Sequence, residues 1–197
     1  MQGPGLVRRL SRGSRAAGRV ATLGSVAAIA VAATAQAHVS SRVENGHLIA
    51  RSDGAADIVK VSCGSDLRVK VNGLDPTAGA APCASIRRVR VLAGGGPDTI
   101  NVSRVGPRNG FSNKGLRSLY SVQVFGGASS DRISGSRLSD LLAGGVGHDV
   151  LRGRAGSDLL RGGPGSDLLR GGRGPDVLIG GHGRDRLVGG AGKDVER

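Results

Sequence analysis

An aspartate recurs every nine residues through the last 72 residues of the chain, and this spacing limits the possible folds more than any other feature. The series begins at Asp131 and ends at Asp194, and its clearest copy is residues 162–170, GGPGSDLLR. Eight copies of the frame GGxGxDxUx, in which U is a large aliphatic residue, follow one another from Gly126 to Arg197 without an insertion. A period held over so many copies indicates a repeat architecture in which each copy is one structural unit.

Each position of the frame has a physical role. Glycines at positions 1, 2 and 4 let the backbone bend tightly and adopt positive φ angles. Positions 7 to 9 are long enough for a very short strand, and the side chain at position 8 is expected to point inward. The residues at position 8 are Ile133, Leu142, Leu151, Leu160, Leu169, Leu178, Leu187 and Glu196. The repeats therefore predict coils stacked about 4.8 Å apart that bury a ladder of aliphatic side chains.

Stacked coils would also bring the aspartates together, and like charges at that separation repel. A divalent cation would remove the repulsion by binding the carboxylates together with backbone carbonyls at the glycine bends. Oxygen ligands in flexible geometry suit Ca²⁺, which takes about 6–8 of them, better than Mg²⁺. The sequence contains no competing Cys–His cluster. Calcium is therefore the expected ion; the alternative is a glycine-rich solenoid or disordered tail whose aspartates only form turns.

These residues resemble the haemolysin-type calcium-binding repeat of RTX (repeats-in-toxin) proteins. The resemblance implies an all-β fold, a right-handed parallel β-roll or β-solenoid with short strands and two nonapeptides per coil. It implies that each ion lies between turns one coil apart, held by aspartates and by carbonyls of the glycine bends. The predicted metal-binding residues are Gly145, Gly147, Asp149, Asp158, Gly163, Gly165, Asp167, Gly172, Gly174, Asp176, Gly181, Gly183, Asp185, Gly190, Gly192 and Asp194.

Three copies depart from the frame. Ser129 replaces a glycine in residues 126–134, Ser136 and Leu138 replace two glycines in residues 135–143, and Arg154 replaces one in residues 153–161. We expect weak or absent metal sites in these copies. Arg154 would in addition place a cation beside a proposed cation site.

The first 37 residues are typical of a secretory signal peptide. Five arginines and no acidic residue precede an apolar run over residues 20–33, and Ala35-Gln36-Ala37 offers a cleavage site. An organellar transit peptide is the alternative. The run is too short and too interrupted for a spanning helix, so no transmembrane anchor is expected after cleavage. The chain is predicted to be secreted, to the extracellular space or the cell surface.

Residues 38–125 are predicted to be a more degenerate, β-rich and solenoid-like region. Short runs of alternating polarity are separated by turn signals. Residues 93–101 carry the nonapeptide frame once, with Asp98 at position 6, although a lone turn aspartate is the simpler interpretation. Cys63 and Cys83 are the only cysteines, and an even count in an exported chain favours a disulfide.

The composition narrows the function. Glycine accounts for 36 of 197 residues and tryptophan for none, so repetition has to supply the core. Removal of the leader's five arginines lowers the net charge from +13 to +8, and with scattered basic residues and few aromatics a nucleic-acid partner is not expected. No sequence motif looks catalytic, so the chain is predicted not to be an enzyme. The alternatives are a small β-helix hydrolase or lyase using Asp53, Asp57 and Asp66, or a metal-free basic solenoid that binds anionic surface polymers.

The sequence also suggests a partner surface. Copies alternate between the two faces of a β-roll, so four aliphatic residues at position 7 would form one outer stripe: Leu141, Leu159, Val177 and Val195. This stripe could mediate self-association or could reflect plain β-propensity. The expected partners are therefore calcium ions and either a cell-surface polymer or a second copy of the chain.

Overall fold

The computed structural model describes residues 39–76, 81–111 and 120–197. The predicted signal peptide, residues 1–37, lies outside these residues. Among the described residues, no helix has the length and apolar character needed to cross a membrane.

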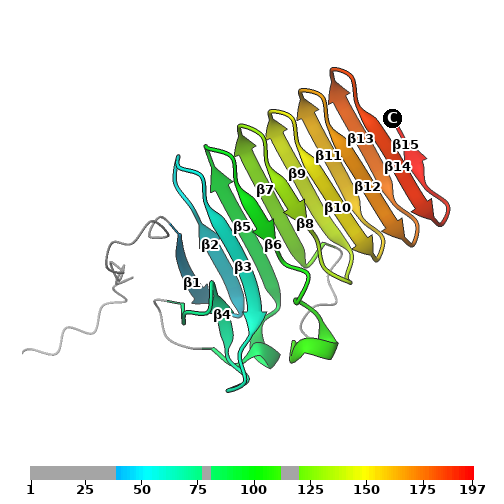
Figure 1. Cartoon of the computed structure of the whole chain (residues 1–197). Helices are drawn as coiled ribbons and strands as arrows, with labels where there is room; N and C mark the ends of the chain where they lie inside the picture. Colours follow the sequence, from blue (N-terminus) through cyan, green and yellow to red (C-terminus); the bar gives the residue numbers. More distant parts are fainter. Residues whose placement is uncertain (1–38, 77–80, 112–119) are drawn as a thin grey trace, which may run out of the picture.

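Two sheets account for nearly all of the described structure (Figure 1). The first sheet contains, in spatial order, β1 (Ser40–Glu44), β2 (His47–Arg51), β5 (Arg88–Gly94), β7 (Val122–Ala128), β9 (Asp140–Val146), β11 (Leu159–Pro164), β13 (Val177–His182) and β15 (Val195–Glu196). The second contains β4 (Val69–Val71), β3 (Ile58–Cys63), β6 (Thr99–Asn101), β8 (Arg132–Ser134), β10 (Val150–Ala155), β12 (Leu168–Arg173) and β14 (Arg186–Ala191). Two short 3₁₀ helices, η1 (Cys83–Ser85) and η2 (Pro107–Asn109), lie in the connections.

Successive copies alternate between the two sheets, so each strand pairs with the strand one coil away. Leu160 on β11 is opposite Leu178 on β13, and Leu151 on β10 is opposite Leu169 on β12, each pair in parallel register. Partners in the repeats are thus 18 residues apart. This confirms the predicted all-β parallel roll with two nonapeptides per coil.

The strands of the repeats are longer than the expected three residues. Strands β10 to β14 each contain six residues, because pairing continues into the glycine positions of the following copy. For example, Gly163 is opposite Gly181 and Pro164 is opposite His182. Glycine without a side chain still supplies a backbone N–H and C=O to the ladder, which the sequence pattern of three non-glycine residues did not indicate.

Within the repeats, the core consists of the two inward-facing ladders at position 8, and it continues into the buried residues that precede the repeats. Leu142, Leu160 and Leu178 of the first sheet and Leu151 and Leu169 of the second are fully buried. The ladder ends at the last copy, where Glu196 is exposed and accepts a hydrogen bond from Gly189 N at 2.6 Å.

The described residues that precede residue 126 continue both sheets. Strand β5 pairs with β7 and β6 pairs with β8, in parallel and without a break at residue 126. Antiparallel strands lie at the start of the roll, where β1 pairs with β2 and β4 pairs with β3. The predicted solenoid-like region is therefore built on the same sheets as the repeats.

The two edges of the roll differ. Connections from the first sheet to the second lie at the upper edge in Figure 1 and are short along the whole roll. Connections at the lower edge are short only in the repeats, whereas those from β3 to β5 and from β6 to β7 are long excursions. The predicted disulfide joins Cys63 and Cys83 at this edge, with their Cα atoms 6.0 Å apart.

Candidate metal-binding turns

The aspartates at position 6 form two hydrogen-bonded ladders, one along each edge. In each ladder the backbone N–H of one aspartate donates to Oδ1 of the aspartate one coil further along. The pairs are Asp131–Asp149, Asp149–Asp167 and Asp167–Asp185 at the upper edge and Asp140–Asp158, Asp158–Asp176 and Asp176–Asp194 at the lower edge, with N···O distances of 2.8 to 3.0 Å. The sequence expectation that these aspartates stack in pairs is therefore confirmed.

The second carboxylate oxygen of most of these aspartates is buried and unpaired. In the described residues, Oδ2 has no hydrogen-bond partner in Asp131, Asp149, Asp158, Asp167 and Asp176. Each of these residues is at most 3% exposed. A buried polar atom without a partner costs about 1–3 kcal/mol, and more when it is charged. Oxygens in this state are suited to bind a cation.

The glycine at position 1 leaves open the space around Oδ2. A Cβ at Gly162 would overlap Oδ2 of Asp167 and would lie 2.6 Å from the carbonyl oxygen of Gly180, one coil away. A Cβ at Gly153 would likewise overlap Oδ2 of Asp158. A carboxylate oxygen and a carbonyl oxygen of the adjacent coil therefore converge on the same point.

The glycines at positions 2 and 4 serve the close approach of neighbouring turns. Gly163 has φ of 120° and Gly165 has φ of 150°. A Cβ at either residue would overlap the carbonyl oxygen of Gly145 or Gly147, respectively, in the preceding coil. These carbonyls add a second group of oxygens beside the aspartate ladder.

Burial raises the pKa of the aspartates in the ladders. The pKa of Asp149 rises to about 6, mainly because the carboxyl group is buried and also because Asp167 and Asp131 carry like charges. The pKa of Asp158 rises to about 7, again mainly through burial, with Asp176 contributing repulsion. In both, a backbone hydrogen bond from the preceding aspartate partly opposes the rise. Without a cation, the ladders are therefore costly to ionise.

The donor set fits a hard cation. No group of three or more His, Cys, Asp or Glu side chains that could hold a metal lies within the described parts of the chain. A metal site in these turns would instead combine aspartate oxygens with several backbone carbonyls. Such an all-oxygen set suits Ca²⁺, which accepts irregular geometry, better than Zn²⁺ or Mg²⁺.

The predicted metal-binding residues separate between the two edges. The upper edge holds Gly145, Gly147, Asp149, Gly163, Gly165, Asp167, Gly181, Gly183 and Asp185, and the lower edge holds Asp158, Gly172, Gly174, Asp176, Gly190, Gly192 and Asp194. Each residue lies at the turn where its repeat position requires it. Their role as ligands stays a prediction.

The copy at residues 135–143 has replaced the open carboxylate by an internal hydrogen-bond pair. Ser136 N donates to Oδ2 of Asp140 at 2.5 Å, and Ser136 Oγ donates to Oδ1 at 2.7 Å. Burial still raises the pKa of Asp140 to about 8. Because both oxygens of Asp140 already have donors, this copy is the least suited to hold an ion.

In the other two departing copies, the residue that replaces glycine adopts the positive φ angle that glycine has in the regular copies. Ser129 has φ of 78° and Arg154 has φ of 88°, both in the left-handed region that side chains disfavour. The aspartates of their copies, Asp131 and Asp158, nevertheless keep an unpaired buried Oδ2. The expectation of weak sites in these two copies therefore rests on the replaced glycines and on the charge of Arg154, and not on loss of the carboxylate.

Sequence reasoning missed the extension of the upper ladder towards the N-terminus. Asp57 N donates to Oδ1 of Asp98, and Asp98 N donates to Oδ1 of Asp131, both at 2.8 Å. Asp98 is thus not a lone turn aspartate, contrary to the simpler interpretation of its sequence. Its place in the nonapeptide frame of residues 93–101 was the available signal.

Of the three acidic residues of the hydrolase alternative, Asp53 and Asp57 both carry charge close enough to raise the pKa of Asp98, whereas Asp66 lies away from Asp57. Asp57 precedes β3, whereas Asp66 follows it, so the length of this strand, about 20 Å for six residues, separates them. Asp66 instead forms an ion pair with Lys70 at 2.9 Å. A pair of carboxylates for glycoside hydrolysis has to lie about 5–9 Å apart, and Asp66 is too far from Asp57 to form such a pair.

Comparison with protein families agrees with this geometry. The model for the RTX calcium-binding nonapeptide repeat (4 copies) matches residues 125–160, 134–169 and 161–196. Residues 125–196 therefore carry RTX calcium-binding repeats, in which the turns and strands described above form a β-roll. A search of curated proteins and a search of solved structures found no match.

Proposed function

We propose that the chain is an exported calcium-binding protein whose ordered β-roll has a structural or cell-surface binding role. The observation that carries the proposal is the row of buried, unpaired Oδ2 atoms along both edges. Calcium bound there would supply positive charge between the carboxylates of adjacent coils.

The chain's own residues would hold the ion in the copies that keep the full glycine set. At the upper edge, Asp149 and Asp167 offer Oδ2 atoms in adjacent coils, and the backbone at Gly145 and Gly147 lies against the turn that follows. At the lower edge, Asp176 is in the equivalent position. Because such a site requires two stacked coils, ion binding is coupled to folding.

Export is supported by two features. The arginine-rich leader with its small-residue cleavage motif is typical of secreted proteins, and disulfides persist in oxidising compartments. Extracellular calcium modules bind with dissociation constants of about 10⁻⁴–10⁻³ M. The roll would then stay loosely ordered at low cytoplasmic calcium and become rigid outside.

The test is a calcium titration by calorimetry, with circular dichroism alongside and magnesium as the control ion. The proposal expects saturable calcium binding with a gain of β signal and a much weaker response to magnesium. Absence of binding, with the β signal already complete in chelator, would contradict it and leave a metal-free basic solenoid.

A second copy of the chain is the proposed partner of the first sheet. Leu141, Leu159 and Val177 lie on neighbouring strands in one row of its outer face. Within the repeats, the equivalent row of the second sheet has an arginine at each end, Arg132 and Arg186. Sedimentation in calcium should show dimers that dissociate when Leu159 is replaced by lysine; a monomer at high concentration would contradict self-association.

A further inference from the structure

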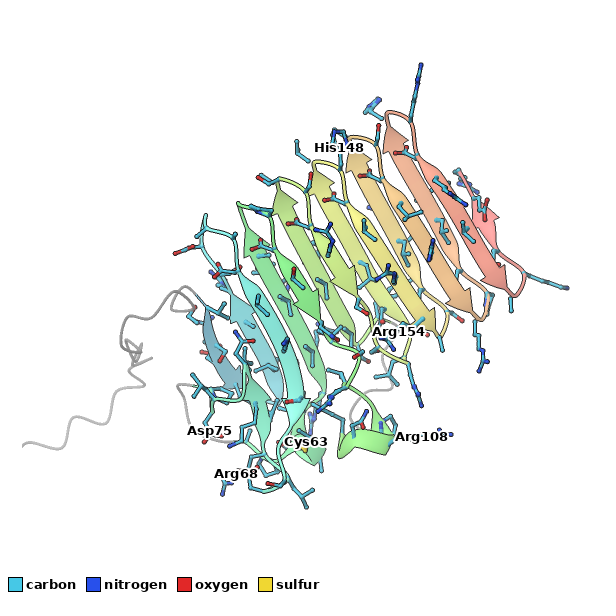
Figure 2. All side chains as sticks on the ribbon, viewed as in Figure 1. Cys63, Arg68, Asp75, Arg108, His148 and Arg154 are labelled. Carbon is cyan, nitrogen blue, oxygen red and sulfur yellow. A yellow bond between two sulfur atoms is a disulfide. The ribbon has the colours of Figure 1, made fainter. Side chains whose placement is uncertain are left out.

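A cleft of about 1000 Å³ lies at the lower edge, outside the aspartate ladders. One wall is the excursion between β6 and β7, at residues 105–109, and the other is formed by the turns of the second, fourth and sixth repeats. Its basic residues are Arg108, Arg137, Arg154 and Arg173. In Figure 2, Arg108 and Arg154 lie on these opposite walls, Arg108 on the excursion and Arg154 at the lower end of β10.

The positive charge of the cleft is not balanced within its lining. The described residues that line it include four arginines and no aspartate or glutamate. All four arginines are exposed, and the ion pairs of the described chain join other residues. Four guanidinium groups around one concave surface create a positive potential that attracts anions.

The excursion wall is firmly attached to the roll. Val105 and Phe111, on either side of η2, are each 1% exposed in the core. Between them, Gly110 lies against the disulfide, because a Cβ there would be 2.7 Å from Sγ of Cys63. The disulfide and the core therefore fix Arg108 opposite the repeat turns, so little order has to be gained on binding.

The opposite wall is built from the departures of the repeat. Arg154 takes the position that glycine occupies in most other copies and keeps the left-handed φ of 88°. A non-glycine residue in this conformation is strained, because its Cβ comes too close to the following carbonyl oxygen. Its Nε donates to Ser134 Oγ at 3.0 Å, which orients the guanidinium. Strain of this kind persists mainly at functional positions.

Spacing along this wall follows the coils. Arg137 and Arg173 occupy the same repeat position two coils apart. Ala155 of the coil between them is opposite Arg173, and the carbonyl of Leu138, the residue after Arg137, lies against Gly156, the residue after Ala155. The Cα atoms of the two arginines are therefore about 10 Å apart. The small side chain of Ala155 leaves the space between them open.

We propose that this cleft binds the oxyanion groups of an anionic polymer, with Arg108, Arg137, Arg154 and Arg173 as the contacting residues. Guanidinium groups make paired hydrogen bonds to phosphate, sulfate and carboxylate oxygens. The cleft shares Gly172 with the predicted calcium turns of the lower edge, but its four arginines are not among the predicted metal ligands, and the proposal does not depend on the proposed function. The departures from the repeat thus supply a second binding surface at the lower edge.

The test uses the full chain at about 0.15 M salt, where charges beyond about 8 Å are screened, with three probes that carry the same chemistry: polyphosphate, dextran sulfate and polygalacturonate. Protein and probe are dialysed against the same calcium buffer, because these polyanions bind calcium themselves. Binding is measured by calorimetry. The preferred probe identifies the oxyanion. The double variant Arg137→Ser/Arg173→Ser should weaken that binding roughly tenfold. The matched control, Arg152→Ser/Arg170→Ser, removes the same charge from the outer face of the second sheet and should weaken binding less than about twofold.

The variant Arg154→Gly distinguishes a loss of polymer binding from a loss of folding stability. It restores the residue that fits the backbone, so the urea midpoint should stay constant or rise, while affinity for the preferred polymer falls about threefold. The proposal is overturned if none of the three polymers binds the wild-type chain. It is also overturned if the cleft variants bind as tightly as wild type, or if the control pair loses as much affinity as the cleft pair.

Discussion

Replacing Asp167 by asparagine should strengthen the fold in chelator and remove calcium stabilisation. Oδ1 of Asp167 accepts the N–H of Asp149 at 2.8 Å, and an asparagine carbonyl can accept it equally. The difference lies at Oδ2, which is buried and unpaired. An amide nitrogen there carries no charge and can donate to the Gly180 carbonyl, on which Oδ2 already converges.

The magnitudes follow from those contacts. Removal of an unpaired buried oxygen should raise the free energy of unfolding in chelator by about 1–3 kcal/mol. Calcium at about one hundred times its dissociation constant stabilises a folded chain by about 2.7 kcal/mol per site. The calcium increment, defined as the stability in calcium minus the stability in chelator, should therefore fall by about 2.7 kcal/mol for each site that uses Asp167.

The assay is urea unfolding followed by circular dichroism near pH 8, with either calcium or chelator. Asp140→Asn is the matched control. Ser136 donates to both oxygens of Asp140, and an amide cannot accept both bonds, so this variant should lose about 1 kcal/mol in chelator. Its calcium increment should be unchanged.

Two results would refute the reasoning. If Asp167→Asn lowers stability in chelator and keeps the calcium increment, Oδ2 of Asp167 is not a ligand. If Asp140→Asn loses as much of the increment as Asp167→Asn, pairing by Ser136 does not separate metal-free turns from metal-binding ones.

Three further predictions concern the scaffold. Gly165→Ala should lower the free energy of unfolding by at least about 2 kcal/mol, because the Cβ of the alanine would overlap a carbonyl of the preceding coil. Gly54→Ala is the control: a Cβ at Gly54 would have no neighbouring atom within 4 Å, so the same urea assay should show almost no change. In chelator, stability should fall as the pH rises from about 4 to 7, because the folded pKa of Asp158, about 7, exceeds its ordinary value of 3.8. Over this range the unfolded chain has already lost a proton that the folded chain still holds and must give up. Calcium should flatten this slope in urea titrations across pH. Replacing Cys63 and Cys83 by serine should cost about 3 kcal/mol, measured as the shift in unfolding free energy; an unchanged value would show that the lower-edge excursion does not need the bond.

The sequence predicted the regular part of the roll because its period is visible in single residues. Glycine, aspartate and leucine at fixed phase each have one structural use, so the parallel register between Leu160 and Leu178 followed directly. The disulfide was predictable for a similar reason, since only one pairing exists for Cys63 and Cys83.

The missed features depend on contacts between positions without a fixed spacing. Asp57, Asp98 and Asp131 are neighbours in one ladder, but their sequence separations are 41 and 33 residues, against 18 in the repeats. Excursions of unequal length at the lower edge hide the period. The pairing of Ser136 with Asp140 was hidden differently, because it depends on the direction of a side chain within one turn.

The residue at position 1 of the frame decides whether there is open space beside the aspartate Oδ2, although the ladder of aspartate hydrogen bonds continues in either case. Gly126, Ala93 and Ser52 take this position in successive coils, as the register of β7, β5 and β2 requires. Gly126 leaves room for the unpaired carboxylate oxygen of its copy, whereas Ala93 carries a methyl group at that point. The hydroxyl of Ser52 donates a hydrogen bond to the Ala93 carbonyl at 2.6 Å. This is the carbonyl of position 1 in the adjacent coil, which in the repeats lies beside the aspartate Oδ2. The aspartate hydrogen bonds therefore belong to the fold of the whole upper edge, and the open space beside the carboxylate belongs only to the coils with glycine at position 1.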